Sequence, residues 1–232
     1  MEQELEILIN RVWITPGADR LLSFLSDFSA WAPWLLGLVV IGILFGNFKL
    51  RAVILTIGLA IGLSDGIMVN LLKHAVARPR PSQVEPGVRS VTLGKPPGHF
   101  PRITGLFSEP IVIFPHGTIP PREHSGFVAC PDTAHEIRGR SFPSGHAANN
   151  MAAATVLICF YRRWGWFYLP IALLIAYARI YTGAHWPLDV AAGILVGVAG
   201  GWLAVKIMQL LWRRFGSRAF STLSAEHPDL IH

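Results

Sequence analysis

Three short clusters of polar residues carry the side-chain types that chemistry on a phosphate group requires. They supply three cations, a Ser-Gly pair, two histidines and one carboxylate, in the residues Lys73, Arg80, Ser144, Gly145, His146, Arg179, His185 and Asp189. Hydrolysis of a phosphate ester or diphosphate needs positive charge around the non-bridging oxygens. One histidine can attack phosphorus while a second transfers the proton. The clusters therefore predict an enzyme that binds a phosphate and attacks it through histidine.

The predicted phosphate-binding cations are Lys73, Arg80 and Arg179. The planar guanidinium of an arginine can bind two oxygens at once. The Ser144 hydroxyl and the backbone N–H groups that follow it through Gly145 can add donors, because a helix is expected to begin here and helix N-termini favour anions. A Ser-Gly pair before a helix is also a common cap, so the alternative is that this pair has only a structural role.

The third cluster places His185 and Asp189 four residues apart, and on a helix such residues share a face. The carboxylate is then expected to hold the tautomer of the His185 imidazole and to leave the other ring nitrogen free to attack phosphorus. His146 is expected to protonate the leaving oxygen and then to activate water. A single histidine at a membrane edge is more often a plain polar cap; the coincidence of all three clusters favours catalysis.

The elements that must position these residues are long and apolar. The chain has 232 residues, of which 52% are hydrophobic and only 15% charged, whereas soluble domains carry about 25% charged residues. This composition predicts one integral membrane domain over residues 1–232, an all-α polytopic helix bundle with about five transmembrane helices. The five predicted spans are Phe28–Phe48, Ala52–Leu72, Ala147–Tyr161, Trp164–Ala178 and Val190–Trp212.

Charges between the spans predict the orientation. The first and second spans are linked through Lys49 and Arg51, the third and fourth through Arg162 and Arg163, and more arginines follow the fifth. The positive-inside rule makes this side cytoplasmic and puts the three clusters on the outer face. The net charge of +6 is spread over these flanks and the clusters, so no nucleic-acid partner is expected. Residues Glu4–Trp13 predict a short N-terminal helix that lies in the interface.

The segment 82–142 is rich in proline and predicts a long extracytoplasmic loop, with at most short strands such as Pro110–Phe114. Two readings stay open: a floppy connection, or a lid that shapes the substrate entrance. Four histidines in this loop lack the spacing of a zinc site, so no metal is expected; they are His99, His116, His124 and His135.

Three features inside the spans predict packing. Glycines recur at every fourth position in two ridges that are expected to let helices pack closely within the monomer. The ridges are Gly58, Gly62 and Gly66, and Gly193, Gly197 and Gly201. Asp65 lies inside the second span, where a carboxylate is costly and usually paired or functional. We interpret it as a support for the bundle, with a catalytic role as the alternative.

The motifs together resemble the type-2 phosphatidic acid phosphatase superfamily. Its patterns are Lys-x6-Arg-Pro, Pro-Ser-Gly-His and Ser-Arg-x5-His-x3-Asp, and the match here runs from Lys73 to Asp189. One position departs from the pattern, because Ala178 stands where the family has Ser. Arg78-Pro79 is a second Arg-Pro pair that competes with Arg80 for the first motif, and the spacing from Lys73 favours Arg80.

The resemblance implies that phosphate hydrolysis passes through a phosphohistidine on His185, needs neither metal nor cofactor, and is blocked by vanadate. It implies a membrane lipid phosphatase, and the charge distribution adds the expectation that its site lies on the outer, periplasmic face of the bacterial plasma membrane. The expected substrates are undecaprenyl diphosphate, phosphatidylglycerophosphate, phosphatidic acid or the lipid A 1-phosphate, and the sequence does not choose among them. The alternatives are a lipid-to-lipid phosphotransferase and a non-catalytic membrane transporter or scaffold. Oligomeric state is left open.

Overall fold

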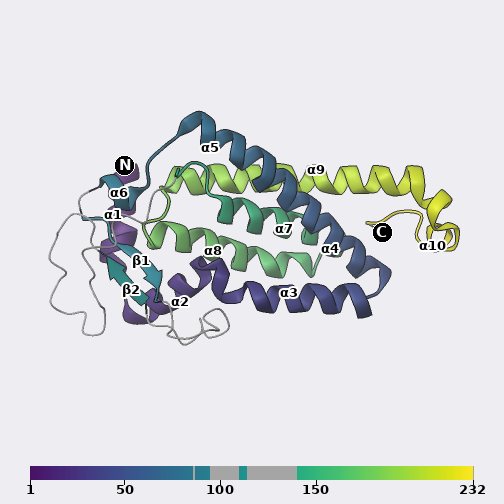
Figure 1. The fold of residues 1–232 in the computed structure, drawn as a ribbon, viewed down its shortest axis with the longest axis horizontal. Helices are drawn as coiled ribbons and strands as arrows, with labels where there is room; N and C mark the ends of the chain where they lie inside the picture. The colour runs from purple at the N-terminus through teal and green to yellow at the C-terminus, as the bar shows by residue number, and fades with distance from the viewer. Residues whose placement is uncertain (86, 95–109, 114–139, 232) are drawn as a thin grey trace.

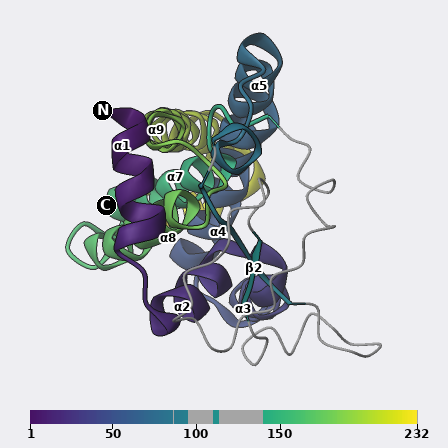
Figure 2. The ribbon, with the colours of Figure 1, turned by 90° about the vertical axis from the view of Figure 1, so that its left-hand side faces the viewer.

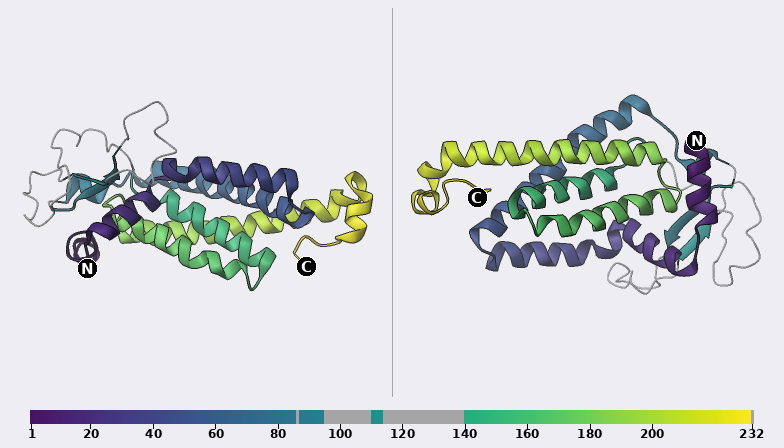
Figure 3. Two further views of the ribbon diagram at one scale, coloured as in Figure 1. Left: turned by 90° about the horizontal axis from the view of Figure 1, so that it is seen from below. Right: turned by 180° about the vertical axis from the view of Figure 1, so that it is seen from behind.

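The computed structural model describes residues 1–85, 87–94, 110–113 and 140–231. Five helices run side by side as an elongated bundle (Figures 1 and 3). They are α3 (Phe28–Phe45), α4 (Phe48–Ile61), α7 (Gly145–Tyr161), α8 (Leu169–Tyr181) and α9 (Pro187–Ala219). The predicted all-α membrane bundle is confirmed. The loop histidines and most of the segment 82–142 lie outside the described residues.

Three helical stretches are long and apolar enough to cross a membrane: Phe28–Phe45, Phe48–Val84 and Pro187–Arg218. The second is continuous as far as Val76, because α4 runs through a π-helical segment, η2 (Gly62–Val69), into α5 (Asn70–Val76). The other two predicted spans form the shorter helix α7 and the pair η5 (Gly165–Tyr168) and α8. α3 exposes a wide apolar surface, Leu36 and Leu38 included, as expected of a helix that faces lipid.

Helix α7 lies at the centre of the bundle and packs against α9, α8 and α4. The ridge of Gly193, Gly197 and Gly201 on α9 makes this contact close. A Cβ atom added at Gly197 would lie 2.3 Å from the carbonyl oxygen of Ala148 on α7. The absence of side chains therefore lets the two backbones approach, as the sequence predicts.

The other predicted glycine ridge makes no close helix contact with the described residues. Added Cβ atoms at Gly58, Gly62 and Gly66 would meet nothing within 4 Å. These glycines lie on the outer face of α4 and η2, while the opposite face carries Ser64, which contacts Gly200 of α9. The prediction was wrong because a four-residue repeat marks one face of a helix without telling which neighbour that face meets.

The N-terminal segment and the two strands gather at one end of the bundle (Figure 1). The predicted interfacial helix forms α1 (Glu2–Ile7) and the π-helical η1 (Leu8–Val12), and α2 (Pro16–Ser26), which the sequence analysis did not predict, follows. Figure 2 shows α1 lying across this end of the bundle. Strands β1 (Ser90–Leu93) and β2 (Pro110–Ile113) pair antiparallel, with Ser90 opposite Ile113. Short α6 (Pro81–Val84) lies nearby.

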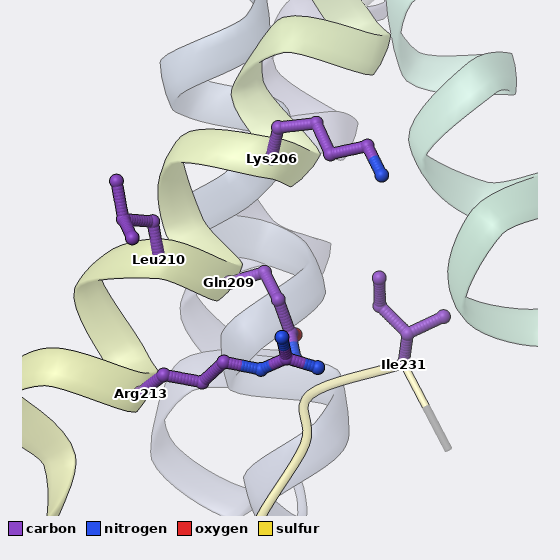
Figure 4. A pocket seen from close by; sticks show the side chains of 5 residues that line it. All are labelled: Lys206, Gln209, Leu210, Arg213 and Ile231. Atoms are coloured by element: carbon purple, nitrogen blue, oxygen red, sulfur yellow. The ribbon is translucent and has the colours of Figure 1, made fainter.

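The opposite end of the bundle holds the α3–α4 and α7–α8 links and α10 (Ser221–Glu226) (Figure 1). The C-terminal tail folds back onto α9, where Gln209 donates to Asp229 and accepts from the backbone N–H of Leu230. A pocket of about 380 Å³ remains beside the tail (Figure 4). Its lining residues are Lys206, Gln209, Leu210, Arg213 and Ile231.

Candidate active site

The three sequence clusters meet at the end of the bundle that carries α1 and the strands. Lys73 lies on α5 and Arg80 immediately before α6, while Arg179 lies in the last turn of α8. Ser144, Gly145 and His146 form the start of α7, His185 lies in the α8–α9 link, and Asp189 in the first turn of α9. The charges of Arg179, Lys73 and Arg80 all act on His146. The fold therefore brings together cations and histidines that are far apart in sequence.

His185 is held in an orientation that suits nucleophilic attack. The side chain is 3% exposed, and its Nδ1 lies 2.7 Å from the carbonyl oxygen of Ser141. A carbonyl oxygen can only accept, so Nδ1 carries the hydrogen and Nε2 keeps a free lone pair. Burial first, and then the charges of Arg179 and Arg80, lower the pKa of His185 well below its ordinary value. The imidazole is therefore neutral at pH 7 and able to attack through Nε2.

Asp189 is connected to His185 through Ser141. The prediction that the Asp189 carboxylate contacts the His185 ring directly was wrong. The fully buried carboxylate of Asp189 accepts from the Ser141 hydroxyl, from the backbone N–H of Trp186 at 3.0 Å and from Arg78 at 2.9 Å. The prediction assumed that His185 and Asp189 lie on one helix, but α9 begins only at Pro187. His185 precedes the helix, so the four-residue spacing does not place it on the face of Asp189.

Ser144 begins α7 as a helix cap. Its hydroxyl accepts from the backbone N–H of Ala147 at 3.5 Å, and its own N–H donates to the carbonyl oxygen of Asp189 at 2.9 Å. Gly145 lies close to Asp65, since an added Cβ would lie 2.8 Å from Asp65 Oδ1 and would require that carboxylate to shift. The Ser-Gly pair therefore acts as a helix cap, and the Ser144 backbone N–H joins the first turn of α7 to the first turn of α9.

Asp65 also accepts a hydrogen bond from Asn149 Nδ2 at 3.1 Å. Asn149 lies on α7, one turn beyond His146. The carboxylate therefore joins the η2 segment to the helix that carries His146, as its interpretation as a support for the bundle predicts.

Two arginines line a pocket of about 390 Å³ between α2, α6 and β1. Arg179 donates from Nη1 to the carbonyl oxygen of Ser26 at 2.8 Å. The Nε–H groups of Arg179 and Arg80 are both buried and have no partner within the described part of the chain. Buried donors of this kind are rare and call for an acceptor. Phosphate oxygens match them in charge and geometry.

Arg78 has a different environment from Arg80. It forks onto the carboxylate of Glu2 at 2.8 and 3.3 Å, reaches Asp189, and stacks over the ring of Trp186 at 5.0 Å. Its guanidinium is thus already occupied by carboxylates, while Arg80 shares a pocket with Arg179. The geometry favours Arg80 over Arg78 as the phosphate-binding arginine of the first cluster.

Sequence reasoning missed two residues of this site, Ser141 and Glu2. Ser141 lies three positions before Ser144 and belongs to none of the motifs, and only its contacts with His185 and Asp189 reveal it. Both of the first two predicted spans lie between Glu2 and Arg78 in the sequence. Among the described residues, no group of three histidine, cysteine or acidic side chains is placed to hold a metal ion.

The fold and the site define a helical membrane protein with a histidine and arginine centre at one end of its bundle. The chain belongs to the PAP2 superfamily, whose family model matches residues 50–213. It is 39% identical to the lipid A 4'-phosphatase of Bacteroides thetaiotaomicron over 37% of this chain and 41% of the relative. It is 44% identical to the undecaprenyl-diphosphatase of Sulfolobus acidocaldarius over 29% of this chain and 33% of the relative.

The crystal structure of Aquifex aeolicus LpxE has a similar fold. It superposes with a TM-score of 0.58 and 26% sequence identity, covering 88% of this chain and 93% of that one. The chain spans about half or less of the length of several curated relatives that it matches. The family and the fold are therefore established.

Proposed function

We propose that this protein is a membrane lipid phosphatase that hydrolyses a lipid phosphate or diphosphate through a phosphohistidine on His185. The observation that carries the proposal is the buried His185 imidazole, whose Nδ1 donates to the carbonyl oxygen of Ser141 and whose Nε2 has no hydrogen-bond partner among the described residues. The Nε–H groups of Arg80 and Arg179, which have no partner in the part of the chain that the structure describes, are suitable donors for the oxygens of the phosphate. The relatives named as lipid A phosphatases and undecaprenyl-diphosphatases support a lipid substrate.

In the proposed first step, Nε2 of His185 forms a bond to phosphorus while the bond from phosphorus to the leaving oxygen breaks. Lys73, Arg80 and Arg179 stabilise the charge on the non-bridging oxygens. His146 donates a proton to the leaving oxygen. Because the anionic substrate lies among these cations, it favours the protonated form of His146 that this role needs.

In the second step, His146 takes a proton from a water molecule as the water attacks phosphorus. The phosphorus–nitrogen bond breaks, and His185 returns to its neutral state with inorganic phosphate as the product. The fixed cations perform the charge neutralisation that a divalent metal performs in other phosphatases. The proposed reaction therefore needs no cofactor.

We further propose that the site faces outward from a bacterial plasma membrane. The support is the charge distribution: Lys49 and Arg51 lie in or beside the α3–α4 link, and Arg162 and Arg163 follow α7. Both links lie at the end of the bundle opposite the site (Figure 1). By the positive-inside rule this opposite end is cytoplasmic. The lipid headgroup would then be reached from the outer leaflet.

The test is phosphate release from a panel of detergent-solubilised lipid phosphates, with and without vanadate. The panel contains undecaprenyl diphosphate, phosphatidylglycerophosphate, phosphatidic acid and lipid A. We expect release from at least one of them, inhibition by vanadate and no effect of a chelator. A purified, folded protein that releases no phosphate from any of them would contradict the proposal. Transfer of the phosphate to an added lipid alcohol would instead favour the phosphotransferase alternative.

A further inference from the structure

The N-terminal helix reaches the catalytic end of the bundle through Glu2. One carboxylate oxygen of Glu2 accepts from Arg78 Nη2 at 2.8 Å. The other accepts from the backbone N–H of Leu188 at 3.1 Å and from Arg78 Nη1 at 3.3 Å. Leu188 belongs to the first turn of α9, whose N–H groups lack partners within the helix. Glu2 thus binds α9 and Arg78 at the same time.

Arg78 continues this connection to the nucleophile. Its Nη1 lies 2.9 Å from Asp189 Oδ1, and the other oxygen of Asp189 accepts from the Ser141 hydroxyl. The carbonyl oxygen of Ser141 accepts from Nδ1 of His185 at 2.7 Å. Hydrogen bonds therefore connect Glu2 to Arg78, Arg78 to Asp189, Asp189 to the Ser141 hydroxyl, and the Ser141 backbone carbonyl to His185.

Several contacts fix Arg78 in this place. Its guanidinium stacks on the ring of Trp186, and Trp186 Nε1 donates to the carbonyl oxygen of Pro79 at 3.1 Å. Arg78 keeps 27% of its side chain exposed, and it does not line the pocket shared by Arg80 and Arg179. Only a planar fork can bind two carboxylates and stack on a ring at once, and a lysine cannot.

We propose that Glu2 and Arg78 are positioning residues that orient the His185 imidazole for attack. The proposal rests on the proposed function, because it concerns the same site. It makes the N-terminal helix α1 a part of the catalytic end, and it assigns the Arg78-Pro79 pair a role separate from that of Arg80. Loss of either side chain frees Asp189 and Ser141 to shift, and with them the ring that must meet phosphorus in line.

The experiment compares Glu2→Gln and Arg78→Lys with the wild-type protein and with Glu4→Gln. Glu4 lies on the same helix, is exposed, and pairs with the N-terminal amine at 3.0 Å, so it is a matched control. For each protein we measure kcat and KM, together with inhibition by vanadate and by inorganic phosphate. Vanadate can adopt the five-coordinate geometry that a bond to His185 requires, whereas phosphate reports only on the cations.

We expect Glu2→Gln and Arg78→Lys to lower kcat about 10- to 100-fold, since a small misplacement of a reacting group can cost that much. Vanadate inhibition should weaken in parallel, because a transition-state analogue responds to the same misplacement. KM and inhibition by phosphate should stay close to the wild-type values. Glu4→Gln should match wild type in all four measurements.

Two results would overturn the inference. One is wild-type kcat and vanadate inhibition in both variants. The other is an equal loss of vanadate and phosphate binding together with a lower melting temperature, which indicates a merely structural role. If the wild-type protein releases no phosphate from any lipid, the proposed function fails. The stabilisation of each folded variant by vanadate and by phosphate, measured as a shift in melting temperature, then still decides the inference.

Discussion

At the scale of single residues, the site depends on how His185 is held. Its Nδ1 donates to a backbone carbonyl, that of Ser141, and the Ser141 hydroxyl donates to Asp189. A backbone acceptor survives any change of side chain at position 141. The Asp189 carboxylate therefore acts on His185 only indirectly, through Ser141. Substitutions of His185, Ser141 and Asp189 should lower the activity by different amounts.

We predict that His185→Ala lowers phosphate release by about three orders of magnitude or more, because the residue that forms the covalent intermediate is lost. Ser141→Ala keeps the carbonyl and loses only one hydrogen bond to a charged group, so a loss of about 10-fold is expected. Steady-state kinetics on both purified variants measures this difference. Near-normal turnover by a folded His185→Ala protein would contradict the mechanism.

The two arginines of the pocket allow a second prediction. Arg80→Lys and Arg179→Lys keep the positive charge but lose the Nε–H groups that are buried without a partner in the described residues. Loss of charge-assisted hydrogen bonds should lower kcat/KM about 10- to 100-fold. Arg51→Lys, at the opposite end of the bundle, is the control and should be silent. If Arg80→Lys left kcat/KM unchanged while Arg78→Lys raised KM, the phosphate-binding role would belong to Arg78 and not to Arg80.

Glu6 allows a prediction about pH. Both of its carboxylate oxygens are buried without a partner among the described residues. Burial, with smaller effects from Asp189 and Glu2, raises its pKa from 4.5 to about 9. Between these two values the folded state keeps a proton that the unfolded state releases, so the free energy of unfolding falls as pH rises, by at most about 1.4 kcal/mol per unit.

Glu6→Gln removes this titration while keeping the shape of the side chain. We expect the variant to melt at a higher temperature than wild type at pH 8, and the two melting temperatures to converge towards pH 5. Thermal unfolding in detergent across this range makes the measurement. A difference between the two proteins that is constant with pH would show that Glu6 does not change its protonation there.

At the scale of elements, the contact between α7 and α9 positions the site, because His146 lies in the first turn of one helix and Asp189 in the first turn of the other. Gly197→Ala should push these helices apart, since the new Cβ would lie 2.3 Å from a backbone oxygen. The expected cost is about 1–3 kcal/mol of stability. Gly62→Ala is the matched control, since its new Cβ meets nothing within 4 Å. Unfolding in detergent compares the two, and equal stability of both variants would contradict the close packing.

At the scale of the whole molecule, the site and the basic links lie at opposite ends of the bundle (Figure 1). We predict that the site end is outside. In a protein with Cys130→Ser and Cys159→Ala, an impermeant thiol reagent on intact cells should label Glu4→Cys and spare Ser217→Cys, once any outer membrane is permeable. The reverse pattern would overturn the orientation.

The sequence by itself determined the membrane bundle and most of the chemical groups of the site. Long apolar runs with charges at their ends predict helices because backbone groups inside a bilayer must bond within the segment. The motif spacing likewise identified His146, His185 and the arginines that we propose bind phosphate. These signals are local or periodic along the chain, and they can be read without knowing which elements are neighbours.

Only the tertiary structure decided which groups touch. The carbonyl oxygen of Ser141 fixes the tautomer of His185, and different partners separate Arg78 from Arg80. The fold also brings Glu2 to Arg78, which in turn binds Asp189. It also turned one glycine ridge towards α7 and the other, at Gly58, away from the bundle. Such contacts depend on how rigid helices rotate and shift against each other in three dimensions. Residue spacing fixes the face of a helix on which a side chain lies, but the packing of all the helices fixes what that face meets.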